Sequence, residues 1–322
     1  MSTVKNYLSL IRFSHTIFAM PFAMIGFFLG VYPLAAYIRW SRETHGPGWH
    51  SFIIPNEILD QSQAPMTGWQ IAGRLGLVVL CMVFARSAAM AFNRWLDVKW
   101  DAMNPRTAIR EIPKGIISKS SALRFVIFNC IAFIVCTWFI NPVCFALSFV
   151  ALAVVLGYSY TKRFTPLCHL VLGLGLSLAP IGAYLAVTGR FALLPILFSL
   201  AVIFWVSGFD IIYALQVEEF DRNNQLYSMP SWLGKARALR VSEFLHLLST
   251  ACVVTAGIYG HFGWAYWLGI AVFVGMLIYQ HAIVKPNDLS KVNLAFMTAN
   301  GIASVVFAVL VIADMYLVSA RF

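Results

Sequence analysis

The chain has 322 residues, of which 60% are apolar and only 11% are charged, and its mean hydropathy is +0.78. A soluble domain usually carries roughly 25% charged residues. The composition therefore excludes an ordinary soluble globule, a disordered chain and a disulfide-stapled secreted domain. Lipid is the expected solvent for most of the chain, and its 10 Trp and 12 Tyr suit anchoring at two membrane interfaces.

The net charge is +10, from 23 Lys and Arg against 13 Asp and Glu. In a membrane protein such an excess is typical of cytoplasmic loops and of contact with anionic lipid headgroups. We therefore expect a lipid bilayer as partner and no nucleic acid. A basic pocket would also suit a diphosphate.

Nine continuous apolar runs can each cross a bilayer as a helix of about 20 residues. A helix satisfies its backbone polar groups internally, whereas a transmembrane β-barrel would alternate apolar and polar residues. The sequence therefore predicts an all-α polytopic membrane protein, a single domain over residues 1–322 with nine transmembrane helices in one bundle around a central cavity. In chain order, the runs cover residues 16–37, 70–92, 123–140, 143–160, 167–185, 191–209, 240–259, 264–284 and 294–318.

The loop charges predict the orientation of the bundle. With the N-terminus inside, 17 of the 23 Lys and Arg fall in inner regions, five fall in outer regions and Arg86 lies within a span. This asymmetry predicts a cytoplasmic N-terminus and an external C-terminus. One long extracytoplasmic loop, about residues 38–68, has no assignable role. Arg86 either neutralises an acid inside the bundle or extends towards the membrane interface.

Two segments at the inner ends of predicted spans hold seven of the 13 acids. In the first segment Asn93, Asp97 and Asp101 recur every four residues, so a helix would place them on one face. Asn104 follows closely. Carboxylates stacked in this way repel each other unless a cation lies between them. Oxygen ligands with open positions suit Mg²⁺, which completes its coordination shell with water and phosphate.

Basic residues crowd the same segment, namely Arg94, Arg106, Arg110 and Lys114. Arg can bind phosphate oxygens bidentately, so acids and Arg together suit a metal-bridged diphosphate. A secondary transporter is the rival class, because it also combines many spans with intramembrane charge. Transporters place their sites near the midplane on interrupted helices, so acids at the inner ends favour diphosphate chemistry.

The second acidic segment runs from Asp210 to Asp221. On a continuous helix these two residues are close to three whole turns apart and face the same way. Glu218 is then offset by roughly 80°, and Glu219 points to the opposite side. Asp210 and Asp221 are the better candidates for ligands, with Glu218 as a further one.

The remaining candidate ligands show no pattern. His169, His246 and His281 lie in or beside spans, and we expect them to be isolated from one another, without a haem or metal role. The six Cys show no metal-ligand spacing and are expected to be packing residues.

The motifs resemble those of the UbiA superfamily of intramembrane prenyltransferases, particularly its 4-hydroxybenzoate polyprenyltransferase branch. Residues 93–101 resemble the family's NxxxDxxxD motif, and residues 104–107 continue it as NPRT. Residues 158–163 resemble its YxYTKR segment. Residues 208–213 and 219–222 resemble its second aspartate motif, which Tyr227-Ser-Met-Pro230 follows.

The chain departs from the family pattern at Val217, where the first Asp of an Asp-x-Glu-x-Asp motif is usual. This departure removes a ligand of a second metal ion or shifts that role to Glu218 or Asp210. A smaller departure is Glu111, at a position where Pro commonly follows the Arg.

The resemblance implies transfer of a polyprenyl chain from polyprenyl diphosphate to an aromatic acid acceptor in quinone biosynthesis, with Mg²⁺ as cofactor. The acceptor would be a 4-hydroxybenzoate-like acid or, alternatively, an aromatic acid of the menaquinone pathway. The expected location is a bacterial inner membrane, with the active site opening to the cytoplasmic side. The polyprenyl tail would leave the bundle sideways into lipid.

Roles for individual residues follow from the same resemblance. The implied Mg²⁺ ligands are Asp97, Asp101, Asp221 and Glu218. The implied catalytic residues are Asp97, Asp101, Asp221, Arg94 and Lys162. The implied substrate-binding residues are Asn93, Asn104, Arg106, Arg110, Lys114, Tyr160, Tyr213 and Asp210. The two Tyr are expected to face the allylic cation or to anchor the chain at the membrane interface.

Overall fold

The computed structural model describes residues 3–11, 19–31 and 66–319. These residues are helical apart from turns, and they contain no strand beyond one isolated bridge between Lys285 and Asp288. The predicted all-α class is confirmed. The expected extracytoplasmic loop 38–68 lies almost wholly outside the described residues.

Eight helices are long and apolar enough to cross a membrane. They correspond to eight of the nine predicted runs, and two of them carry short extensions at the site end of the bundle. They are α5 (Gly68–Leu96), α7 (Lys119–Ile140), α8 (Pro142–Thr161), α9 (Cys168–Thr188), α10 (Leu193–Ala214), α13 (Lys235–Tyr259), α14 (Trp264–Ile283) and α16 (Asn300–Ser319).

The first predicted run, 16–37, is described only as α2 (Met20–Val31), which is shorter than a membrane span. The rest of that run lies outside the described residues, apart from Ala19. The predicted count of nine spans therefore stays a prediction. Helix α1 (Thr3–Leu10) precedes it.

Local sequence explains how the helices begin and end. Asn141 is the only residue between α7 and α8, and its side chain accepts a hydrogen bond from the N–H of Cys144. Pro142 occupies the first turn of α8, where a missing N–H costs nothing. Helix α9 ends at Gly189, whose φ of 67° is a left-handed conformation that glycine adopts easily.

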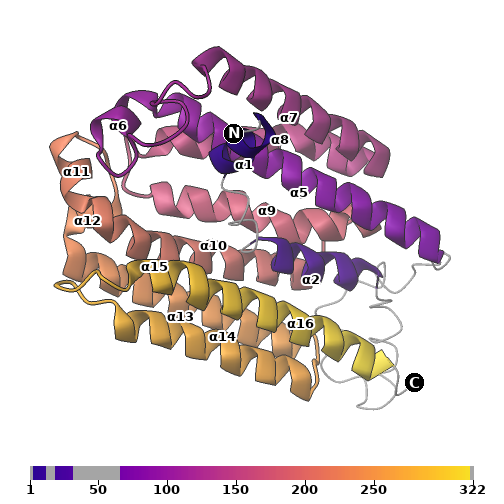
Figure 1. Cartoon of the computed structure of the whole chain (residues 1–322). Coiled ribbons are helices and arrows are strands. Elements are labelled where there is room, and N and C mark those ends of the chain that lie inside the picture. Colours follow the sequence, from indigo (N-terminus) through magenta and orange to yellow (C-terminus); the bar gives the residue numbers. More distant parts are fainter. Residues whose placement is uncertain (1–2, 12–18, 32–65, 320–322) are drawn as a thin grey trace.

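The helices form one bundle in which α10 packs between α9 and α13 (Figure 1). Further close pairs are α5 with α7, α2 with α9, and α14 with α16. The short helices α6 (Val98–Met103) and α11 (Glu218–Asn223) lie at the same end of this bundle (Figure 1). The two acidic segments are far apart in the sequence, and the fold brings them to one end of the bundle.

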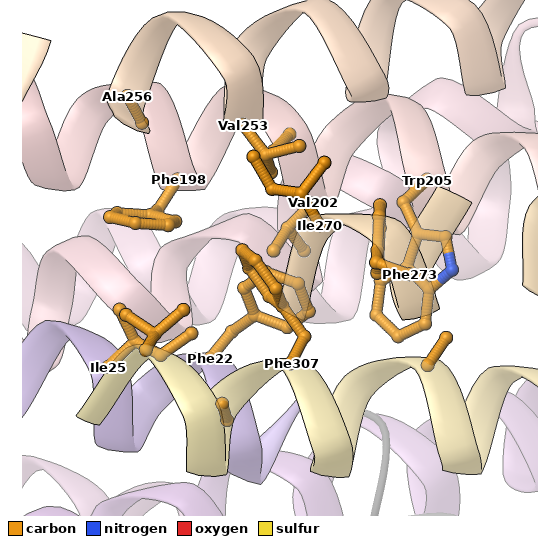
Figure 2. Packing of buried hydrophobic residues seen from close by; sticks show 14 of the residues in the cluster. Phe22, Ile25, Phe198, Val202, Trp205, Val253, Ala256, Ile270, Phe273 and Phe307 are labelled. Carbon is orange, nitrogen blue, oxygen red and sulfur yellow. The ribbon is translucent and has the colours of Figure 1, made fainter. Parts of the chain in front are cut away.

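The largest apolar core joins α2, α10, α13, α14 and α16. Trp205 of α10 is completely buried there, with ring centroids 5.3 Å from Phe22 and 5.9 Å from Phe273 (Figure 2). Burying aromatic side chains of this size contributes strongly to helix association. This packing fixes α10, whose last turns carry Asp210 and Tyr213.

Helices α9 and α10 approach very closely. A Cβ on Gly173 of α9 would lie 2.5 Å from the backbone O of Ile203 in α10, so no larger residue fits without a shift. Small residues at such contacts allow helix backbones to pack directly in membranes. The contact lies one turn after His169 and brings the start of α9 against α10.

Candidate active site

A cavity of about 360 Å³ lies where both acidic segments meet. We call it the polar cavity. Its wall includes most of the predicted site residues: Asn93, Arg94, Asp97, Asp101, Asn104, Arg106, Arg110, Lys162, Asp210, Tyr213 and Asp221. Three predicted site residues are absent from this wall, namely Lys114, Tyr160 and Glu218.

The first acidic segment follows a nearly continuous helical path. Helix α5 ends at Leu96, Asp97 forms the junction, and α6 starts at Val98. The backbone N–H of Asp97 donates to the O of Asn93 at 3.0 Å, and that of Asp101 donates to the O of Asp97 at 2.8 Å. The four-residue spacing therefore places all three side chains in the same cavity wall, as the sequence predicts.

Asp97 is buried and lies between two cations from the end of α8. The Nζ of Lys162 is 2.5 Å from its Oδ2, and the Nη2 of Arg163 is 3.4 Å from its Oδ1. The side-chain amide of Asn93 also donates to Oδ2 at 3.3 Å. A buried carboxylate is costly unless it is compensated in this way.

Asp101 is buried as well, but only one of its oxygens is well paired. Its Oδ1 accepts from Arg110 at 2.6 Å, whereas the Nη1 of Arg94 stands 4.0 Å from its Oδ2. Among the described residues, Oδ2 is buried without a hydrogen-bond partner. Burial raises the pKa of Asp101 to about 6, although Arg94 opposes the shift.

These donors fit a divalent cation. Hard cations such as Mg²⁺ take carboxylate oxygens, and the buried Oδ2 of Asp101 is an acceptor without a hydrogen bond among the described residues. In the described part of the chain, no three His, Cys, Asp or Glu side chains cluster closely enough to hold a metal by themselves. One or two carboxylates completed by water and phosphate is the usual arrangement for Mg²⁺.

The second acidic segment is not the continuous helix that the sequence suggests. Helix α10 ends at Ala214, a 3₁₀ turn covers Leu215–Val217, and α11 starts at Glu218. A 3₁₀ turn has three residues per turn instead of 3.6, so it changes the phase of every later side chain. Asp210, Val217 and Asp221 all line the polar cavity.

The predicted metal ligand Glu218 is placed differently. It is buried, and its Oε1 lies 2.9 Å from the Nη2 of Arg222, one turn later in α11. This carboxylate is paired with Arg222 and does not line the polar cavity. The structure therefore does not group Glu218 with the other predicted Mg²⁺ ligands.

Tyr213 contacts a predicted phosphate-binding residue. Its hydroxyl accepts from the guanidinium of Arg106 at 2.7 Å, and the same guanidinium carbon lies 4.9 Å from the Tyr213 ring. Phe296 packs on the other side, with ring centroids 4.3 Å apart. Tyr160, by contrast, is 43% exposed and packs against Arg163, and Lys114 is exposed.

The expectation that the His residues are isolated from one another is wrong for His246 and His281, and His169 pairs with an acid. His169 Nδ1 lies 2.7 Å from the Oδ2 of Asp210, and His246 Nδ1 lies 2.9 Å from the Nε2 of His281. Both pairs join different helices over separations of more than 30 residues, so no local spacing could have indicated them. His169 also lines the polar cavity, so the sequence reasoning missed a site residue.

A second, apolar cavity of about 210 Å³ adjoins the polar one. Side chains of α5, α7, α8 and α9 line it. The two cavities share five wall residues, namely Arg86, Met90, Tyr158, Leu172 and Leu176. They therefore form a polar chamber and an apolar chamber with a common border.

Arg86 stands at this border, within the membrane-spanning part of α5. Its Nε is buried without a hydrogen-bond partner, and no carboxylate lies within ion-pair distance of it among the described residues. It therefore neutralises no described acid. A charged residue inside a span usually marks a functional site. The sequence already shows this charge within an apolar run, so Arg86 is a candidate site residue that the sequence reasoning did not include.

Comparison with known proteins identifies the family of this chain. The sequence model of the UbiA prenyltransferase family matches residues 64–302. A 4-hydroxybenzoate octaprenyltransferase of Francisella tularensis subsp. novicida is 26% identical over 79% of this chain and 88% of the relative. One from Nitrosospira multiformis is 28% identical over 73% of this chain and 81% of its own length.

Solved structures show the same fold. A UbiA homologue from Aeropyrum pernix K1 superposes with a TM-score of 0.72 at 26% identity, covering 95% of this chain and 98% of the homologue. A UbiA homologue from Archaeoglobus fulgidus, bound to DMAPP and Mg²⁺, has a TM-score of 0.64 at 20% identity and covers 97% and 99%. The chain belongs to the UbiA prenyltransferase family.

Proposed function

We propose that this prenyltransferase moves a polyprenyl chain from its diphosphate to an aromatic acid acceptor in quinone biosynthesis. The observation that carries the proposal is the polar cavity, where acids from two distant segments and several Arg and Lys meet beside an apolar chamber. The curated relatives named 4-hydroxybenzoate octaprenyltransferase support the acceptor class.

The expected Mg²⁺ ligands are Asp97, Asp101 and Asp221, which line the same cavity and would share the ion with water and the diphosphate rather than form a cluster of three carboxylates. Mg²⁺ bound there would neutralise the diphosphate as a Lewis acid. The Mg²⁺ bound to the Archaeoglobus homologue supports Mg²⁺ as the cofactor. Glu218 is left out because it pairs with Arg222 outside the cavity wall.

The basic residues of the cavity would bind the diphosphate directly. Arg94, Arg106, Arg110 and Lys162 line the wall around the acids, with Asn93 and Asn104 among them. When the allylic C–O bond breaks, negative charge grows on the leaving diphosphate, and fixed cations stabilise that charge most where water is excluded. Tyr213 presents its ring to the same cavity, where it can face the allylic cation.

The apolar cavity suits the start of the prenyl tail. Its wall is formed almost entirely by apolar side chains of membrane-spanning helices. An allylic cation reacts with water, so a chamber that keeps water away protects the transfer. A tail longer than this chamber would continue into lipid between the helices.

Two residues are placed to recognise the acceptor. Arg86 would pair with the carboxylate of an aromatic acid, since it is a cation at the border of the cavities with no described acid beside it. Asp210 would accept a hydrogen bond from the acceptor hydroxyl, since its side chain is 24% exposed in the same cavity.

The loop charges support the orientation stated above, with the polar cavity opening to the cytoplasm of a bacterial inner membrane. A phosphatase fused after Phe322 is expected to be active, and the same enzyme fused within the loop before α7 is expected to be inactive. The reverse pattern contradicts this orientation.

The experiment that tests the function is an acceptor panel in detergent, with one labelled prenyl diphosphate and Mg²⁺. The panel contains 4-hydroxybenzoate, a bicyclic dihydroxynaphthoate, which stands for the menaquinone pathway, and phenol without a carboxylate. With an aromatic acid as acceptor, we expect release of pyrophosphate and formation of a prenylated product. After chelation of Mg²⁺, we expect neither. A panel without any product contradicts the proposal.

Val217 provides a further prediction, because it lines the polar cavity where relatives of this family usually carry Asp. Val217→Asp adds a carboxylate beside Asp221, so activity is expected to persist or rise and the Mg²⁺ concentration for half-maximal activity is expected to fall. Val217→Asn is the uncharged control and should leave the Mg²⁺ requirement unchanged. A large loss of activity in Val217→Asp, but not in Val217→Asn, would show that position 217 does not tolerate a negative charge.

A further inference from the structure

His169, the second residue of α9, is held by three hydrogen bonds, two of them to α10 and one to α12 (Met229–Leu233). Its Nδ1 lies 2.7 Å from the Oδ2 of Asp210, and its Nε2 lies 3.2 Å from the backbone N of Met229. Its own carbonyl O accepts from Ser207 at 3.0 Å. The side chain is buried, so these contacts define its position completely.

The partners of the ring determine its tautomer. A backbone N–H can only donate, so Nε2 must offer its lone pair to Met229. The ring proton therefore resides on Nδ1, which donates to the carboxylate of Asp210. In this arrangement the ring of His169 lies between one backbone donor and one carboxylate acceptor.

The contact with Met229 connects Asp210, through His169, to another part of the wall of the polar cavity. Leu226, Tyr227 and Ser228, just before Met229, line that cavity. The N–H of Tyr227 donates to the O of Lys162 at 2.7 Å, and that of Leu226 donates to the O of Asp221 at 2.8 Å. This segment thus links His169 to the part of the wall that holds the diphosphate-binding residues.

We infer that His169 is a positioning residue for the acceptor: its Nδ1–H fixes the Asp210 carboxylate in one orientation inside the polar cavity. This inference rests on the proposed function, in which Asp210 accepts the acceptor hydroxyl. One oxygen of Asp210 is engaged by His169, and the side chain stays partly exposed to the cavity. The close α9–α10 contact at Gly173 keeps the two helices in register for this bond.

Two isosteric variants separate the two ring contacts. In His169→Asn the amide N replaces Nδ1 and can still donate to Asp210, while the contact with Met229 is lost. In His169→Gln the amide O reaches the place of Nε2 and can accept from Met229, while the donor to Asp210 is lost. His169→Leu loses both contacts.

The measurement is the KM for the acceptor and the KM for the prenyl diphosphate of each variant, with 4-hydroxybenzoate or the best acceptor of the panel. Hydrogen bonds to charged groups contribute roughly 1.5–3 kcal/mol, which corresponds to about a ten- to hundredfold change. We expect the acceptor KM to rise by that factor in His169→Gln and His169→Leu, and to be largely restored in His169→Asn. The KM for prenyl diphosphate should stay within about threefold throughout.

A purely structural role of His169 predicts a different pattern. Both KM values would then change together, and the acceptor KM of His169→Asn would be no closer to that of the unsubstituted chain than the acceptor KM of His169→Gln. Either this pattern or an unchanged acceptor KM in His169→Gln overturns the inference. If the unsubstituted chain still prenylates the acceptor, the proposed function is unaffected by that result. Absence of turnover in the unsubstituted chain overturns the proposed function as well.

A second variant covers the case in which His169→Gln and His169→Leu fail to fold. Asp210→Asn keeps the size of the side chain and removes the charge that His169 orients, so it is expected to raise the acceptor KM by a similar factor. An unchanged acceptor KM in Asp210→Asn contradicts the inference.

Discussion

Replacing Asp97 or Asp101 by Asn is expected to lower prenyl transfer by about a thousandfold or more, which corresponds to roughly 4 kcal/mol of lost transition-state stabilisation. Both carboxylates line the polar cavity, and each is buried beside cations. Asn keeps the shape of Asp but not its charge, so the bundle should fold while the cofactor loses a ligand. Release of pyrophosphate from a labelled prenyl diphosphate measures the effect.

Asp288→Asn is the matched control, because it makes the same chemical change at a fully exposed residue in the loop after α14. It should leave pyrophosphate release unchanged. Near-normal turnover in Asp97→Asn or Asp101→Asn would contradict the metal assignment.

The ion pairs of the cavity explain why metal and diphosphate should bind together. Asp97 and Asp101 are paired with Lys162 and Arg110, so a cation binding alone must compete with these bases. A metal–diphosphate complex brings a positive partner for the acids and a negative partner for the bases at the same time. Both sets of charges then exchange partners without leaving any buried charge uncompensated.

The second large effect is expected at Arg86. Arg86→Met should raise the KM for an aromatic acid by about ten- to a hundredfold, because the variant loses a charge-assisted contact to the acceptor carboxylate. The KM for prenyl diphosphate should stay nearly constant, since other cations surround that group. Steady-state kinetics with each substrate varied in turn checks this result.

Two controls sharpen the Arg86 experiment. Phenol has no carboxylate, so its turnover should be nearly the same in Arg86→Met and in the unsubstituted chain. Arg74→Met removes a cation from the same helix outside both cavities, where Arg74 donates to the O of Ala186 at 2.5 Å. Equal losses with phenol and with the aromatic acid would show that Arg86 does not recognise the carboxylate.

Features set by local spacing could be predicted from the sequence. Eight long apolar runs were sufficient to locate eight helices, because a helix in lipid needs only length and hydropathy. Asn93, Asp97 and Asp101 share a wall because they are four residues apart on a nearly continuous helix. The grouping of Arg94, Arg106 and Arg110 around them follows from their position in the same segment.

Features set by packing between distant segments could not be predicted. Asp210 meets His169 only because α9 and α10 pack closely at Gly173. The 3₁₀ turn at Leu215–Val217 breaks the helical phase that the sequence suggests, so the direction of Glu218 relative to Asp210 could not be predicted. The turn contains no Gly or Pro that would indicate the change.

The role of Arg86 could be predicted only in part from the sequence. A lone Arg within an apolar run indicates a functional site, but the sequence leaves its partner open. Its place at the border of two cavities depends on α5, α8 and α9 together, which contribute Arg86, Tyr158 and Leu172 to the shared wall.

The most direct test of the account is an experimental structure with Mg²⁺ and a non-hydrolysable prenyl thiodiphosphate. We predict the diphosphate in the polar cavity, with Mg²⁺ bound by Asp97 or Asp101 at about 2.1 Å from a carboxylate oxygen. The allylic end of the prenyl chain should enter the apolar cavity. A diphosphate bound elsewhere, or a metal that touches none of Asp97, Asp101 and Asp221, would contradict the account.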